Sequence, residues 1–181
     1  RARRSILLPP ALLFCLLPVA CGGGGGGGGG PGGVQISALE GALNRLGVRC
    51  RVVALGGPTR TAFPAPADTV DLSHLCGDRR ARRDAVVHAA RSFAADLVHG
   101  HLIDHDDSAG LTSQGLPLLM TVHNMRPGWP NGLAQLATAE AHLLVACAQT
   151  VEAELRQDQI PVPVRTAWNG IEFQAFERTA A

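Results

Sequence analysis

The sequence contains no lysine and no tyrosine, and only 4% of its 181 residues are aromatic. Without lysine there is no Walker A phosphate loop, no lysine Schiff base and no lysine general base. All 16 basic residues are arginine, and with 15 acidic residues the formal net charge is +1. The chain therefore lacks the basic field that attracts nucleic acid, and we expect no nucleic-acid partner.

Cysteine is scarce, and its spacing suggests no pairing. The number of cysteines is odd and none form a C-x-x-C pair; they stand at Cys15, Cys21, Cys50, Cys76 and Cys147. This pattern fits neither a zinc ribbon nor a disulfide framework. We expect free thiols in a reducing compartment.

The first 31 residues allow two interpretations. Three arginines within the first four residues precede an apolar run (6–20) that ends at Cys21, as in a secretory or lipoprotein signal. The run is short for a membrane span, which takes about 20 apolar residues. Alternatively, residues 11–17 form a buried parallel strand, and the polyglycine at 22–30 holds no structure of its own. We favour the strand, because the rest of the chain needs a first strand.

Hydrophobic spacing along the remaining sequence predicts alternating strands and helices. Strands are expected at 11–17, 50–55, 96–99, 116–122, 142–147 and 162–167. Helices are expected at 34–46, 79–95, 131–139 and 149–157, with loops at 58–78 and 101–115. The alternation predicts an α/β fold, an open and mostly parallel Rossmann-like sheet with helices on both faces.

Residues that directly follow the predicted strands are the candidate site. In open parallel sheets, ligands bind beyond the carboxyl ends of the strands. The candidates are Gly32, Gly33, Gly56, Gly57, 99–104, His123, Asn124, Ala148, Asn169 and Gly170. Gly32 and Gly33 also precede a predicted helix, whose free N–H groups can bind phosphate.

Polar side chains are densest at 99–107, which holds three histidines and three aspartates. The segment comes close to the H-x-H-x-D-H signature of metallo-β-lactamase-like hydrolases. One extra residue separates His101 from Asp104, and the ligands of that signature depend on a tight loop. We therefore expect no metal site and interpret the segment as a solvated loop. A metal-dependent hydrolase built on it stays an alternative function.

Four arginines begin the helix predicted at 79–95. Arg79, Arg80, Arg82 and Arg83 form a basic cluster between two aspartates. A solvated helix face explains such a cluster. Its functional interpretation is contact with the anionic head groups of a membrane.

Four short motifs, taken in order, resemble one family. They are Gly32-Gly33-Val34-Gln35, Asp96-Leu97-Val98-His99-Gly100-His101, Pro117-Leu118-Leu119-Met120-Thr121-Val122-His123-Asn124 and Asn169-Gly170-Ile171-Glu172-Phe173-Gln174-Ala175-Phe176. Together they resemble the N-terminal, acceptor-side domain of family-four glycosyltransferases with the GT-B fold. The resemblance covers roughly residues 32–176.

The resemblance implies transfer of a sugar from a nucleotide-sugar donor to a sugar, lipid or small-molecule acceptor, with retention and without a cofactor. It implies that His123 is catalytic and lies near the transferred sugar, and that Gly32 and Gly33 approach the donor phosphates. It places His101 and Asn124 among the binding residues. Asn169 and Gly170 would mark the crossover to a donor-binding domain.

Domain boundaries follow from the same resemblance. We expect a first strand or signal-like segment with the polyglycine at 1–31, a Rossmann-like domain at 32–168, and the start of an interdomain linker at 169–181. Half of a two-domain site turns over little substrate, because catalysis needs donor and acceptor held together. We expect a cytoplasmic protein in contact with a membrane; a cleaved signal at 1–21 would instead make it an exported lipoprotein. A tethered binding module without chemistry is a further alternative.

Overall fold

The computed structural model of the chain describes residues 12–17, 32–55, 68–75, 77–101 and 103–168. Within these residues, seven strands form one sheet in the order β3-β2-β1-β4-β5-β6-β7, and every neighbouring pair is parallel. The strands are β1 (Leu12–Leu17), β2 (Arg49–Ala54), β3 (Thr69–Asp71), β4 (Leu97–His101), β5 (Leu118–Val122), β6 (Leu143–Ala146) and β7 (Val164–Thr166). The predicted open parallel sheet is confirmed.

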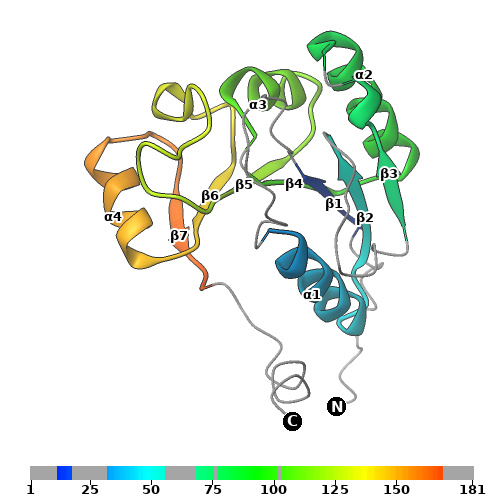
Figure 1. The fold of residues 1–181 in the computed structure, drawn as a ribbon, viewed down its shortest axis with the longest axis horizontal. Helices are drawn as coiled ribbons and strands as arrows, with labels where there is room; N and C mark the ends of the chain where they lie inside the picture. Colours follow the sequence, from blue (N-terminus) through cyan, green and yellow to red (C-terminus); the bar gives the residue numbers. More distant parts are fainter. Residues whose placement is uncertain (1–11, 18–31, 56–67, 76, 102, 169–181) are drawn as a thin grey trace, which may run out of the picture.

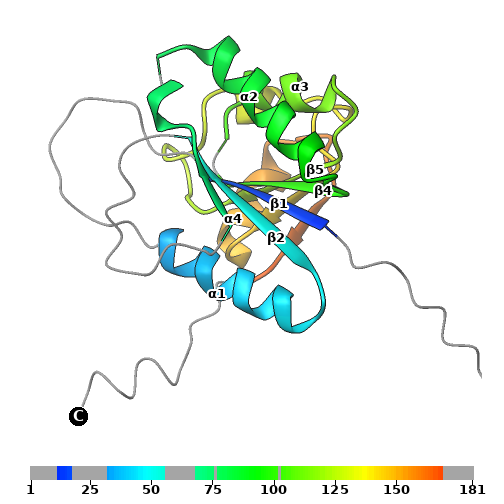
Figure 2. The ribbon, with the colours of Figure 1, turned by 90° about the vertical axis from the view of Figure 1, so that its right-hand side faces the viewer.

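Helices lie on both faces of this sheet, as predicted. They are α1 (Gly32–Arg45), α2 (Arg79–Ser92), α3 (His105–Thr112) and α4 (Gln149–Gln157), with 3₁₀ turns η1 (Ser73–Leu75) and η2 (Leu133–Gln135). α1 lies on one face, and α2 and α3 lie on the opposite face (Figures 1 and 2). α4 lies beside β7 at the edge of the sheet (Figure 1).

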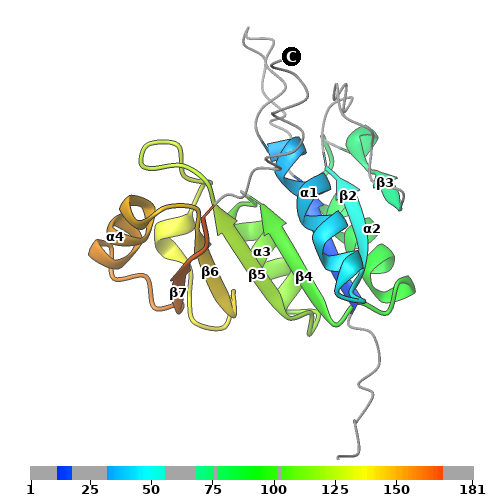
Figure 3. The ribbon, with the colours of Figure 1, turned by 90° about the horizontal axis from the view of Figure 1, so that it is seen from below.

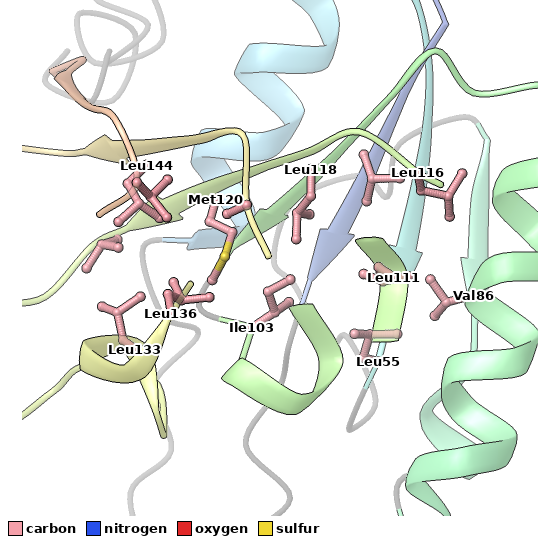
Figure 4. Close-up of a cluster of buried hydrophobic side chains, with 14 of the residues drawn as sticks. Leu55, Val86, Ile103, Leu111, Leu116, Leu118, Met120, Leu133, Leu136 and Leu144 are labelled. Atoms are coloured by element: carbon pink, nitrogen blue, oxygen red, sulfur yellow. The ribbon is translucent and has the colours of Figure 1, made fainter. Parts of the chain in front are cut away.

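The apolar interior is divided by the sheet. The larger cluster lies under α2 and α3 and includes Leu118, Met120 and Leu144, with Ile103 and Leu136 packed over them (Figure 4). A smaller cluster on the α1 side holds Cys50 and Val52, against which Leu43 and Leu97 pack. Successive side chains of a strand point to opposite faces of the sheet. Because Leu97 packs on the α1 side, the residues two and four positions after it in β4 lie on that side as well.

The first strand lies at the centre of the sheet. β1 pairs with β2 along one edge and with β4 along the other, which confirms the strand interpretation of residues 11–17. The chain builds β2 and β3 on one side of β1 and then β4 to β7 on the other. The order of the sheet therefore reverses between β1 and β4, the kind of place where doubly wound sheets bind ligands.

Two segments predicted as loops contain regular structure. Within 58–78, β3 adds a three-residue edge strand whose side chains are largely exposed, so it carried no hydrophobic signal. Within 101–115, α3 begins after Asp104, whose carboxylate accepts a hydrogen bond from the N–H of Asp107 at 2.9 Å. An aspartate in this position stabilises the first turn of a helix that is otherwise polar.

The helix predicted at 131–139 is wrong. Only the turn Leu133–Gln135 is helical, and it is 3₁₀. It starts after Gly132, which has a positive φ of 73°. Leu133 and Leu136 are buried, so their apolar spacing reflects a short turn packed on the core. The strand expected to end at His99 also runs on to His101.

Candidate functional site

Three histidines from two neighbouring strands gather at one end of the sheet. Leu97 of β4 packs on the α1 side, so His99 and His101, two and four residues later, point to that same face. His123 directly follows β5, which is paired with β4. We call His99, His101 and His123, together with Thr121 of β5, the histidine cluster.

The members of the histidine cluster contact one another directly. Nε2 of His99 lies 2.7 Å from Oγ1 of Thr121, and Nδ1 of His101 lies 2.9 Å from Nε2 of His123. The rings of His101 and His123 are stacked, with their centroids 5.2 Å apart and an interplanar angle of 19°. The rings of His99 and His101 are 4.2 Å apart and tilted by 34°.

Burial keeps these imidazoles neutral. It lowers the pKa of His99 to about 4, with a smaller effect from the charge of His123. It lowers the pKa of His101 to about 2, and charge repulsion from His99 and His123 adds to the effect. Burial also lowers the pKa of His123. At pH 7, each ring therefore offers one N–H donor and one unprotonated nitrogen.

The histidine cluster shares its edge of the sheet with the start of a helix. α1 begins at the edge of the sheet where β4 and β5 end (Figure 3). Its first residues are Gly32 and Gly33, the predicted phosphate-binding pair. The N–H groups of a first helical turn have no partner within their own helix and favour an anion. That Gly32, Gly33 and His123 share one ligand stays a prediction.

The other predicted site residues are not part of the cluster. Asn124 is exposed, and its Nδ2 donates to the carbonyl of Gly128 at 3.1 Å within its own loop. Asn169, Gly170, Gly56 and Gly57 lie outside the described residues. Ala148 precedes α4 and is half-buried.

The polar segment 99–107 is divided by the fold and is not the solvated loop that its composition suggested. His99 and His101 belong to the histidine cluster, whereas Asp104 begins α3. His105 contacts Glu140, with Nε2 and Oε2 3.0 Å apart. Within the part of the chain that the structure describes, no group of three or more His, Cys, Asp or Glu side chains is arranged to hold a metal ion.

Two of the four arginines at the start of α2 are paired with carboxylates of this segment. Arg79 pairs with Asp106 and, at 3.2 Å, with Asp104. Arg82 pairs with Asp107 at 2.6 Å, and both side chains are largely buried. The remaining two form only long ion pairs with Asp84: Nε of Arg80 lies 3.9 Å and Nε of Arg83 lies 3.8 Å from a carboxylate oxygen of Asp84. Contact with a membrane through these arginines stays a prediction.

Two contacts of the site were not expected from the sequence. Thr121 is 6% exposed and bonds to His99, and the thiol of Cys147 donates to the backbone carbonyl of His123 at 3.1 Å. The signal for Thr121 was present: it stands two residues before His123, as His99 does before His101, and residues two apart share a face of a strand. Cys147 and Cys50 are both free thiols.

None of the helices among the described residues is long and apolar enough to cross a membrane.

Two comparisons with known proteins both find similarity to glycosyltransferases. The family model described as Glycosyltransferase Family 4 matches residues 30–175. A solved structure of a glycosyltransferase from Rickettsia africae ESF-5 is similar to this chain, with a TM-score of 0.65 at 14% sequence identity. The similarity covers 96% of this chain and 47% of that one, so the chain spans about half the length of this relative. None of the curated proteins compared with the chain matches it.

Proposed function

The chain belongs to Glycosyltransferase Family 4, and from this membership we propose that it forms the acceptor-side domain of a two-domain GT-B enzyme. In this proposal the enzyme moves a sugar from a nucleotide-sugar donor to a hydroxyl of a sugar, lipid or small-molecule acceptor, with retention of configuration. The bond between the sugar and the leaving diphosphate breaks, a bond to the acceptor oxygen forms, and the proton of the acceptor hydroxyl passes to the leaving diphosphate.

The observation that carries this proposal is that the histidine cluster and the start of α1 lie at the same edge of the sheet. Between them, Gly32, Gly33 and His123 offer backbone N–H groups and a neutral imidazole at one edge of the sheet. Negative charge develops on the diphosphate as it leaves, and fixed N–H donors aimed at it stabilise the transition state more than the ground state. We assign the phosphate contact to Gly32 and Gly33 and the catalytic hydrogen bond to His123.

His101 and Asn124 have different degrees of support as binding residues. His101 is 6% exposed and bonded to His123, so it acts from behind that ring. Asn124 is exposed on the loop after β5, where its side chain could turn from Gly128 to a ligand hydroxyl. We assign Asn169 and Gly170 to the crossover between domains, by the family resemblance alone.

We also propose that turnover needs a second, donor-binding domain, because reactants must be held together in a site that excludes water. The chain alone then binds ligands weakly and releases little nucleotide. A hydrolase has less support, since Asp104, Asp106 and Asp107 face arginines and not the histidine cluster.

The test is a titration of the ¹⁵N-labelled chain with UDP-glucose and with GDP-mannose, followed by amide chemical shifts. We expect shifts that concentrate at Gly33, His101 and His123, and weaker ones in His123→Ala but not in His88→Ala, since His88 is exposed on α2. Shifts confined to other regions, or no shift with either compound at millimolar concentration, would contradict the proposed donor contact. Release of UDP or GDP is measured in parallel.

A further inference from the structure

One nitrogen of the histidine cluster is buried without a partner. His101 is 6% exposed, and its Nε2 forms no hydrogen bond within the described part of the chain. Its Nδ1 lies 2.9 Å from Nε2 of His123. Because both rings are neutral, one of these two nitrogens carries the proton and the other accepts it.

Two arrangements of protons satisfy this contact. If His123 donates, the proton of His101 sits on Nε2 and becomes a buried N–H without an acceptor. If His101 donates from Nδ1, its Nε2 is only an unprotonated nitrogen without a donor. Buried N–H groups are left unpaired more rarely than buried acceptors in folded proteins, so the second arrangement is favoured.

We infer that His101 is a positioning residue that donates from Nδ1 to Nε2 of His123 and thereby holds His123 as the tautomer protonated on Nδ1. The Nδ1–H of His123 then forms no hydrogen bond to the described residues and is free to donate to a ligand oxygen. His123 is half-buried, and its Nδ1 is not among the side-chain atoms of the described residues that are buried without a partner, so this donor is open to a ligand. The part of the inference that concerns a ligand rests on the proposed function; the tautomer does not.

The surroundings hold both rings in this relationship. The backbone carbonyl of His123 accepts from the thiol of Cys147, which fixes the start of the loop after β5. The ring of His99 packs against that of His101 and is held in turn by Thr121. Neighbours that orient a functional imidazole in this way also set which nitrogen carries its proton.

The inferred tautomer makes His123 a hydrogen-bond donor to the ligand and not a general base. A His123 whose exposed nitrogen is already protonated donates a hydrogen bond to a hydroxyl or phosphate oxygen, and it does not take up a proton there. The site therefore selects ligands that present an acceptor oxygen next to His123, such as a leaving phosphate. Removing the donor behind His123 would let its proton exchange between the two nitrogens and weaken this selection.

The wild-type chain alone tests the tautomer. With ¹⁵N-labelled histidine, long-range ¹H–¹⁵N correlation spectra at pH 7.5 show which nitrogen of each ring is protonated, and a ¹⁵N–¹⁵N coupling across the hydrogen bond identifies the pair. We expect a protonated Nδ1 and an unprotonated Nε2 in His123, with the coupling to Nδ1 of His101. A protonated Nε2 in His123, or averaged signals of two tautomers, would overturn the inference.

Two variants test the positioning role. In His101→Asn the side-chain amide stands where Nδ1 was and can still donate, whereas His101→Leu has no donor. We expect His123 to keep its tautomer in His101→Asn and to show averaged signals in His101→Leu. His88→Asn, on the exposed face of α2, serves as the control and loses only its own signals. A fixed Nδ1–H tautomer in a folded His101→Leu chain would show that His101 does not position His123.

Turnover separates this inference from the proposed function. In an enzyme complete with its donor-binding domain, we expect His101→Leu to lower kcat about tenfold with little change in KM, and His101→Asn to recover most of it. Normal turnover in His101→Leu would refute the positioning role and leave the proposed function intact. No turnover in the wild type would refute the proposed function, while the tautomer would still be read from the spectra.

Discussion

Nε2 of His99 lies 2.7 Å from Oγ1 of Thr121, and His101 and His123 repeat this relationship two residues further along the same two chain segments. Both pairs bridge β4 and the end of β5 diagonally, because the strands are parallel and His101 is the register partner of Thr121. In the first pair, Thr121 is 6% exposed and His99 is half-buried. In the second pair, His101 is 6% exposed and His123, which directly follows β5, is half-buried.

The first prediction concerns the inner pair. Thr121→Val removes the hydroxyl but keeps the shape, which leaves a ring nitrogen of half-buried His99 without its partner. We expect a loss of about 1–3 kcal/mol in the free energy of unfolding, measured by urea titration at pH 7. Thr121→Ser keeps the hydroxyl and should lose distinctly less. Equal losses in the two variants would show that the methyl group, and not the hydrogen bond, is what matters.

The second prediction is a pH dependence of stability. The pKa of His99 is about 4 in the folded chain, against an ordinary value of 6.5. The unfolded chain therefore binds a proton at this residue over a range where the folded chain does not, so stability is complete above pH 6.5 and falls as the pH drops toward 4. Between pH 7 and pH 5 the loss is about 2 kcal/mol for this residue.

A matched variant isolates that effect. His99→Gln places an amide near the position of Nε2, so it can keep the contact to Thr121 without titrating. We expect urea unfolding of His99→Gln to show a shallower loss of stability than the wild type between pH 7 and pH 5. Identical pH profiles would mean that His99 is not kept neutral by burial.

The third prediction concerns the ion pair between α2 and α3. The side chains of Arg82 and Asp107 are only 14% and 13% exposed. Burial, followed by the charge of Asp104, raises the pKa of Asp107, and Arg82 works against that shift. Arg82→Ala leaves this carboxylate buried without its partner, and breaking such a pair costs about 3 kcal/mol.

Arg80 gives the control for that substitution. Its side chain is 86% exposed and 3.9 Å from Asp84, and exposed pairs of this kind contribute about 0–1 kcal/mol. Thermal and urea unfolding of Arg82→Ala and Arg80→Ala should therefore differ clearly. Similar stabilities would show that the buried pair does not hold α3 against α2.

The fourth prediction concerns Gly100 in the middle of β4. A Cβ placed there would come within 2.6 Å of Cδ1 and 2.9 Å of Cγ1 of Ile103, whose side chain is buried in the larger core cluster. Gly100→Ala should therefore lower the free energy of unfolding by about 1–3 kcal/mol through overpacking. The double variant Gly100→Ala/Ile103→Val should recover part of this loss. A single variant as stable as the wild type would mean that Ile103 moves aside freely.

Much of the fold could be predicted because its strands carry strong hydrophobic signals. The predicted strands include buried runs such as Leu118–Val122, and α4 (Gln149–Gln157) has the predicted bounds. The elements that were missed lack this signal. β3 is held by backbone pairing at the edge of the sheet, and α3 is held by the Asp104 cap and by ion pairs with α2.

The site could be predicted in part for a similar reason. His101 and His123 follow or end buried strands, and the topology of a parallel sheet brings such positions to one edge. The direct contact between their rings depends on the register of β4 against β5, which sequence spacing does not give. The separation of the aspartates from the histidines in 99–107 depends on α3 starting at His105, and that helix was missed.

The last prediction concerns His123 in an enzyme complete with its donor-binding domain. The backbone of His123 is placed by β5 and held by Cys147, and its ring is bonded to His101. A donor fixed in this way contributes most in the transition state, when charge moves to the leaving phosphate. His123→Ala should lower kcat/KM about 100-fold or more, roughly 2.7 kcal/mol. His123→Asn, whose amide stands near the position of Nδ1, should keep more activity than His123→Gln, whose amide stands near Nε2.

A purely structural histidine would give the opposite pattern, a lower melting temperature with near-normal turnover in the folded fraction, so both quantities are measured on the same preparations. Unchanged turnover in folded His123→Ala would remove His123 from the site.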